Sequence, residues 1–141
     1  MELSSRPTLA VTYANDQIQD GAGAQLQRIY GIYALSRFLR VPYVHSPIAH
    51  LGYHGLSALE KNVPSPDLLA EYNRVFHIPS DIDLPEKRVI HEMPDADVAS
   101  IERIRNAGSD TRGLNLIRIR APYPVVCENS IWLTTGRFGN L

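Results

Sequence analysis

The chain has 141 residues, a formal net charge of −1 and a hydrophobic fraction of 44%. This length suits one compact domain and is short for two, and the apolar content is enough for a buried core. A net charge near zero gives no general attraction to nucleic acid or to anionic membranes, so we expect no nucleic-acid partner. Any function must therefore come from a local site.

Cysteine content and hydropathy bear on the compartment. A single cysteine, Cys127, rules out a disulfide framework within the chain. The first five residues contain no apolar segment of the kind that a secretory signal requires. The longest nearly apolar stretch, residues 29–39, contains Ser36 and Arg37 and is too short to span a bilayer. The sequence therefore predicts a cytoplasmic protein with no transmembrane segment.

The first 47 residues predict a βαβ unit. Residues 8–14 and 41–46 have the β-branched, apolar character of strands, and Pro47 closes the second of them. Between them, residues 24–40 carry apolar side chains at helical spacing. A polar loop that contains glycine, residues 15–23, joins the first strand to this helix. We expect the first strand to be central in the sheet.

Two more helices and two more strands are expected in the second half. Ser65-Pro66-Asp67 is typical of a helix start, and a second helix is predicted to open at residues 94–97 and to end at Gly108. Residues 88–93 and 114–120 are predicted strands. Strands that alternate with helices indicate an α/β fold with an open, mostly parallel sheet and flanking helices, in a single domain that spans the whole chain.

A glycine-rich segment, Asp20-Gly21-Ala22-Gly23-Ala24, separates the first strand from its helix. Glycines let the backbone turn sharply and let a ligand approach the amides without a Cβ in the way. The N–H groups and the dipole at a helix start favour an anion. Gln25 and Arg28 lie three residues apart on the same face of this helix, toward the loop. An ordinary tight turn between strand and helix has the same local pattern.

The glycine-rich segment differs from two known kinds of nucleotide-binding loop. Gly21 and Gly23 fit the first two glycines of a dinucleotide-binding fingerprint, but the third position is Leu26. The second strand ends near His45, where an acidic residue for the ribose is expected. A Walker loop is excluded because no Gly-Lys-Ser/Thr follows. The sequence therefore disfavours NAD as a cofactor.

Three segments form a linked series. They are DGAGAQLQRIY at residues 20–30, YVHSP at residues 43–47 and GYHGLSALE at residues 52–60. Together they resemble the opening of fucosyltransferase-like glycosyltransferases. Those enzymes typically have a Gly-x-Gly-[Asn/Ala]-Gln loop after the first strand, and their second strand ends in a His-[Ser/Thr]-Pro turn or similar. The resemblance extends over about residues 8 to 62 and is loose beyond them.

This resemblance implies a GT-B-like enzyme with two Rossmann-like domains, of which the chain would be the N-terminal half. Such enzymes move a sugar from a nucleotide diphosphate sugar, often GDP-fucose, to a hydroxyl of a glycan or protein. The donor is itself a substrate, so no further cofactor is implied. The C-terminal domain would hold most of the donor, through a His-x-Arg-Arg-x-Asp motif, which the 141 residues lack. We therefore expect the missing C-terminal domain to be a partner and this chain alone not to transfer sugar.

Glycosyl transfer has two chemical needs that the candidate residues could meet. The leaving diphosphate needs amide donors or positive charge, and the acceptor hydroxyl needs a base or a positioning group. The substrate-binding candidates for the first need are Gly21, Ala22, Gly23, Gln25 and Arg28. For the second need the catalytic candidates are Asp20 and His45, between which the sequence does not decide. We expect Gln25, Arg28 and His45 to converge at the carboxyl edge of the sheet. The alternative function is a non-catalytic sugar or nucleotide binding module.

Other candidate residues have simpler explanations. His45, His50 and His54 are close in sequence, but a zinc site needs further ligands at suitable spacing, so no metal is expected. His45 could equally order the turn that follows it by hydrogen bonding. Arg118 and Arg120 alternate on a predicted strand and could bind phosphate, although a solvent-facing pair is more common.

Overall fold

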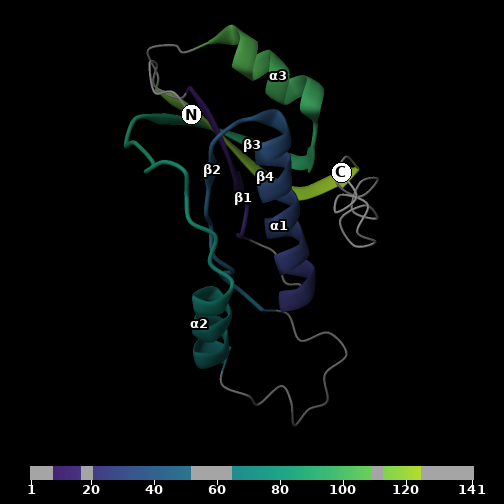
Figure 1. Ribbon diagram of the computed structural model, residues 1–141, viewed down its shortest axis with the longest axis vertical. Helices are drawn as coiled ribbons and strands as arrows, with labels where there is room; N and C mark the ends of the chain where they lie inside the picture. The colour runs from purple at the N-terminus through teal and green to yellow at the C-terminus, as the bar shows by residue number, and fades with distance from the viewer. Residues whose placement is uncertain (1–7, 17–20, 52–64, 109–112, 125–141) are drawn as a thin grey trace.

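The structure is a computed structural model that describes residues 8–16, 21–51, 65–108 and 113–124 (Figure 1). The described elements, in chain order, are β1 (Leu9–Tyr13), α1 (Ala22–Leu39), β2 (Tyr43–Val44), α2 (Ser65–Val75), β3 (Arg88–Ala96), α3 (Val98–Ala107) and β4 (Leu114–Pro124).

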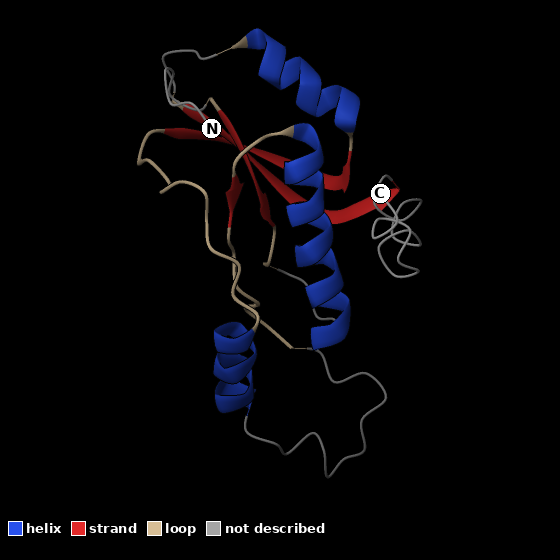
Figure 2. Ribbon diagram, viewed as in Figure 1, coloured by secondary structure: helices blue, strands red, loops and turns tan. Residues whose placement is uncertain are grey.

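The strands form a four-stranded sheet in the order β2-β1-β4-β3, and all three neighbouring pairs are parallel (Figure 2). The prediction of an α/β fold with an open parallel sheet and flanking helices is confirmed, and the arrangement is consistent with a Rossmann-like fold. β1 is a central strand, as expected. Because β1 and β2 are parallel, the segments that follow them leave from the same edge of the sheet, which is its carboxyl edge.

The two faces of the sheet differ. Leu9, Val11 and Tyr13 of β1 belong to one hydrophobic core together with residues of α1 and α3, so both helices cover this face (Figure 1). The alternate residues of the sheet form a smaller cluster on the opposite face, made of Ala10, Val44, Leu114 and Leu116 and joined by Ile82. We call these the helix face and the open face, because no described helix contributes to the second cluster.

β1 is buried along its whole length. All five residues are buried, including Thr12 on the open face. The Thr12 hydroxyl lies 2.7 Å from the hydroxyl of Ser46, which explains how a polar side chain is accommodated there. Side chains of β1 on both faces are therefore buried, although no described helix contributes to the cluster on the open face.

Several boundaries differ from the predictions, and local contacts explain those of α1, β3 and α3. α1 begins at Ala22 rather than Ala24, because the N–H of Gln25 already donates to the Gly21 carbonyl. β3 continues to Ala96, and Asp97 instead caps α3 by accepting a hydrogen bond from the Ser100 N–H at 3.2 Å. The predicted helix end at Gly108 is confirmed by its φ of 75°.

β2 is shorter than predicted, because only Tyr43 and Val44 pair with β1, and a later segment of the chain lies along its outer edge. The Tyr43 N–H donates to the Asp81 carboxylate at 2.7 Å, and the Asp81 N–H donates to the Tyr43 carbonyl at 2.8 Å. The His45 N–H donates to Ser80 Oγ at 2.8 Å. These bonds take the outward-facing groups of β2, so this edge of the sheet is closed.

Candidate functional site

The start of α1 lies at the carboxyl edge, a short distance along the chain from central strand β1. Gly21 is the N-cap residue, in an extended conformation, and no side chain in the described part of the chain caps the helix. The first turn carries no acidic residue. The first amides of a helix have no acceptor within it, and the dipole of an 18-residue helix adds partial positive charge there. This combination suits an anion.

Gly23 keeps that helix start open. The sequence predicted that Gly23 belongs to the loop before the helix, but it lies in the first turn of α1. A Cβ built on Gly23 would meet no atom of the described residues within 4 Å. Among residues 8–16, 21–51, 65–108 and 113–124, nothing fills the space beside the first-turn backbone at Gly23, and Gly21, Ala22 and Gly23 occupy consecutive positions along it.

Gln25 points into the protein. Its side chain is fully buried, its Oε1 accepts a hydrogen bond from the Tyr13 hydroxyl at 3.1 Å, and its Nε2 donates to the His50 carbonyl at 2.5 Å. The amide thus joins β1, α1 and the segment after β2. These contacts describe a structural link at the base of the candidate site, and direct substrate binding by Gln25 stays a prediction.

His45 follows β2 at the same edge. Its Nδ1 lies 2.9 Å from the Tyr43 hydroxyl, and its ring packs edge-on against His77 with centroids 4.7 Å apart. Its Nε2 is buried and has no hydrogen-bond partner in the described part of the chain. Burial, followed by the nearby charge of His77, lowers the pKa of His45 below its ordinary value of 6.5. The structure therefore favours a neutral imidazole.

This shift predicts how stability depends on pH. A histidine whose pKa is lower in the folded chain takes up its proton more readily in the unfolded chain, so stability is full above pH 6.5 and falls as the pH drops below it. Urea titrations between pH 7.5 and 5 are expected to show this loss, and His45→Gln should flatten it. His50→Gln, at an exposed position, controls for removal of a histidine. An unchanged slope in His45→Gln would contradict the assignment.

The predicted site residues are only partly brought together. Gly21, Ala22, Gly23, Gln25 and Arg28 all lie in the first two turns of α1, where Arg28 is half-buried and engaged in an interaction. His45 is at the same edge, as predicted, but its contacts are with Tyr43, His77 and Ser80. Asp20 lies outside the described residues.

A polar cluster that the sequence did not reveal lies on the open face near the carboxyl edge. The Arg118 guanidinium pairs with both Asp16 and Glu92. Burial alone would raise the pKa of Asp16, but the hydrogen bond and charge of Arg118 lower it. Arg118 and Arg120 were considered as a possible phosphate site, but Arg118 is already paired. The strand register places Thr12 and Glu92 on either side of Arg118. The cluster can be recognised only once this register is known.

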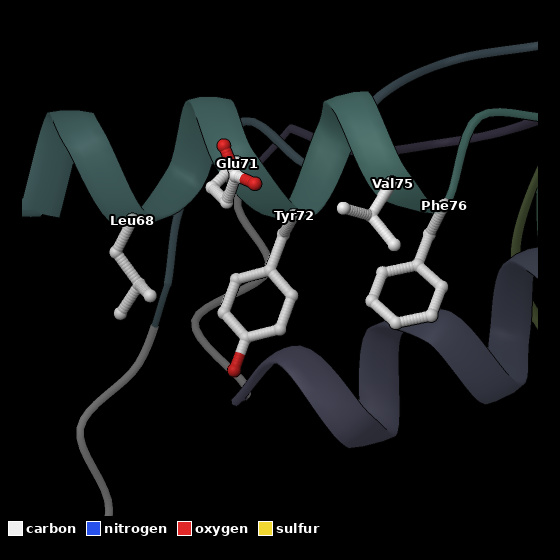
Figure 3. Close-up of a pocket in the computed structure, with 5 residues that line it drawn as sticks. All are labelled: Leu68, Glu71, Tyr72, Val75 and Phe76. Carbon is white, nitrogen blue, oxygen red and sulfur yellow. The ribbon is translucent and has the colours of Figure 1, made fainter.

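A shallow hollow of about 130 Å³ lies along α2. Leu68, Glu71, Tyr72, Val75 and Phe76 line it (Figure 3). Tyr72 and Phe76 stack with centroids 6.1 Å apart, and Leu69 instead packs toward the main core. The hollow is smaller than a typical small-molecule site and almost wholly apolar, so it is a poor candidate for a sugar nucleotide.

Two other kinds of feature are absent from the described ranges. No group of three or more potential metal ligands occurs among them. None of the helices in these ranges is long and apolar enough to cross a membrane. Within this part of the chain, the start of α1 therefore remains the main candidate for a ligand site.

Comparison with known proteins gives no relative from which to transfer a function. No protein-family model matches the chain, no curated protein matches it, and no solved structure matches it. The fold therefore rests on the strand order and packing described above, and the candidate site rests on its own residues.

Proposed function

We propose that the chain is the N-terminal part of a glycosyltransferase that moves a sugar from a nucleotide diphosphate sugar to a hydroxyl of a glycan or protein. Fucose, carried by GDP-fucose, is the sugar that the resemblance favours. A C-terminal donor domain as partner and a cytoplasmic location belong to the same proposal. The parallel Rossmann-like sheet is consistent with it.

The observation that carries the proposal is the open start of α1. It follows a central parallel strand and has glycine at the N-cap. Within the part of the chain that the structure describes, it has no side-chain cap and leaves space beside Gly23. In open α/β sheets, ligands bind at the carboxyl ends of the strands, and helix starts there commonly receive phosphate groups. A diphosphate is the anionic group of a nucleotide sugar.

The proposed reaction needs one group of residues at the leaving diphosphate and another at the acceptor hydroxyl. The acceptor oxygen forms a bond to the anomeric carbon as the bond from that carbon to the diphosphate oxygen breaks. The acceptor proton passes to a base, and the leaving diphosphate gains negative charge that the α1 amides and Arg28 would stabilise. A neutral imidazole is the form that can accept a proton, which supports His45 as a candidate base. Asp20 remains the other candidate.

A non-catalytic binding module is the second candidate, and one observation favours it. The Gln25 amide and the His45 Nδ1 are both hydrogen-bonded to protein atoms, as residues in a fixed structural role would be. The two functions differ in turnover. When the chain is combined with its natural partner segment, a glycosyltransferase releases GDP in an acceptor-dependent manner, whereas a binding module binds the ligand without releasing GDP.

Gly23→Ala tests the site itself. Its methyl group would enter the open space beside the helix start, so we expect GDP-fucose and GDP to bind about tenfold more weakly. The fold should not suffer, because alanine stabilises a helix by up to about 1 kcal/mol relative to glycine. Calorimetric titration and urea unfolding measure the two effects. Gln27→Ala, which is exposed on the same helix, is the matched control. Undiminished binding by Gly23→Ala would reject this site.

A further inference from the structure

The two outer edges of the sheet differ in whether another segment of the described chain bonds to them. β2 has its outer edge closed by Ser80 and Asp81, whereas no described strand pairs with the outer edge of β3. β3 is nine residues long, and its third residue, Ile90, is 50% exposed. A long edge strand with an exposed apolar side chain is a template for pairing with another strand.

The side chains of β3 on the open face have a self-complementary pattern. Arg88, Ile90 and Glu92 are in register with Leu114, Leu116 and Arg118 of β4, which places all three on the open face. Suppose that two copies of β3 pair antiparallel about a two-fold axis at Ile90. Arg88 of each copy then lies directly opposite Glu92 of the other, and Ile90 lies opposite Ile90.

We propose that this edge is a homodimer interface, in which two copies of β3 pair antiparallel about Ile90 to form one continuous eight-stranded sheet. Two Arg88–Glu92 pairs flank a central contact between the two isoleucines. Such cross-strand pairs stabilise antiparallel strands, and an antiparallel strand is often added to the edge of a parallel sheet. The occupant of this edge is therefore a second copy of the chain.

Neighbouring registers are less favourable. A shift that centres the axis on Val89 places Glu92 opposite Glu86, and a shift that centres it on Glu92 places the two Glu92 carboxylates together. A shift to His91 places Arg88 opposite Pro94, which has no N–H to donate. The Ile90 register alone among these forms both ion pairs.

Features at the end of β3 limit the interface to its first six residues. Pro94 and the irregularity between Asp95 and Ala96 interrupt regular pairing there. The charged groups within the first six residues already have neighbours in the same copy. Arg88 donates to the Pro85 carbonyl at 2.9 Å, and Glu92 pairs with Arg118. Arg88 and Glu92 are both exposed, so their side chains can reach a strand of a second copy that pairs with β3.

A charge exchange between two variants tests the pairing. Arg88→Glu alone and Glu92→Lys alone each place like charges opposite one another, so each variant should self-associate at least about tenfold more weakly than the unmodified chain. A mixture of the two variants restores both opposite-charge pairs, so it should form heterodimers. Sedimentation velocity measures both results, and circular dichroism checks that each variant is folded.

A disulfide test fixes the register. Residues directly opposite in an antiparallel pair have Cα atoms about 4.5–5.5 Å apart, within the range of a disulfide. Ile90→Cys should therefore form covalent dimers on oxidation, whereas Arg88→Cys should not, and the unmodified chain controls for Cys127. A chain that is monomeric at all concentrations, or a mixture that fails to form heterodimers, would overturn the proposal. Equal crosslinking of both cysteine variants would also overturn it.

Discussion

Gly113→Ala is expected to lower the free energy of unfolding by about 3 kcal/mol or more. Gly113 has a φ of 97°, where alanine is strained by about 1–2 kcal/mol. In addition, an alanine Cβ would lie 2.6 Å from the Lys87 carbonyl carbon and closer still to its oxygen. That oxygen accepts a hydrogen bond from the Leu114 N–H at 3.2 Å, so the backbone cannot withdraw without disturbing the start of the β3–β4 pairing.

Urea unfolding measures this loss, and Gly108→Ala is its matched control. Gly108 also has a positive φ, 75°, but a Cβ there meets nothing within 4 Å. Gly108 has a ψ of −170°, a conformation that is almost restricted to glycine, so Gly108→Ala should show strain of about 1–3 kcal/mol without the clash and lose less stability than Gly113→Ala. Equal losses in the two variants would mean that the contact with Lys87 does not contribute.

Gln25→Leu is expected to lower the free energy of unfolding by about 2–4 kcal/mol. Leucine has a similar size, so the main effect is the loss of the hydrogen bonds to the Tyr13 hydroxyl and the His50 carbonyl. Each buried polar group that loses its partner costs about 1–3 kcal/mol. Gln27→Leu, which is exposed on the same helix, should change stability by less than about 0.5 kcal/mol.

This variant also separates two roles for Gln25. If Gln25 is a structural link, Gln25→Leu should lower the free energy of unfolding and leave GDP-fucose binding by the folded protein nearly unchanged. If its amide binds the ligand, as the sequence suggested, Gln25→Leu should weaken GDP-fucose binding and change stability little. Urea unfolding and calorimetric titration on the same samples distinguish them.

The parts of the fold that follow from local chemistry could be predicted from the sequence. The glycine at the end of α3 and the alternation of Ile117 and Ile119 with Arg118 indicated a helix end and a strand, and both are present. The βαβ unit followed from its apolar spacing. The predicted start of α3 was too early, because Pro94 and Asp97 are both residues that suit a helix start. In the structure, residues up to Ala96 instead pair with β4 as part of β3.

The parts that depend on distant contacts could not be predicted. The strand order places β4 beside β1, and nothing local in either strand specifies this. The burial of Gln25 depends on Tyr13 and on a carbonyl 25 residues away. Similarly, the pairing of Arg118 with Asp16 joins residues 102 positions apart. Local patterns therefore identified candidate residues, and the packing decided how each is used.

Mapping of backbone amides by NMR during a titration with GDP-fucose tests the central claim most directly. If the start of α1 receives the diphosphate, the amide resonances of Ala22, Gly23 and Ala24 should shift first and saturate together, and GDP should reproduce these shifts while free fucose should not. No shift at millimolar GDP-fucose, or shifts confined to residues away from the carboxyl edge, would contradict the account.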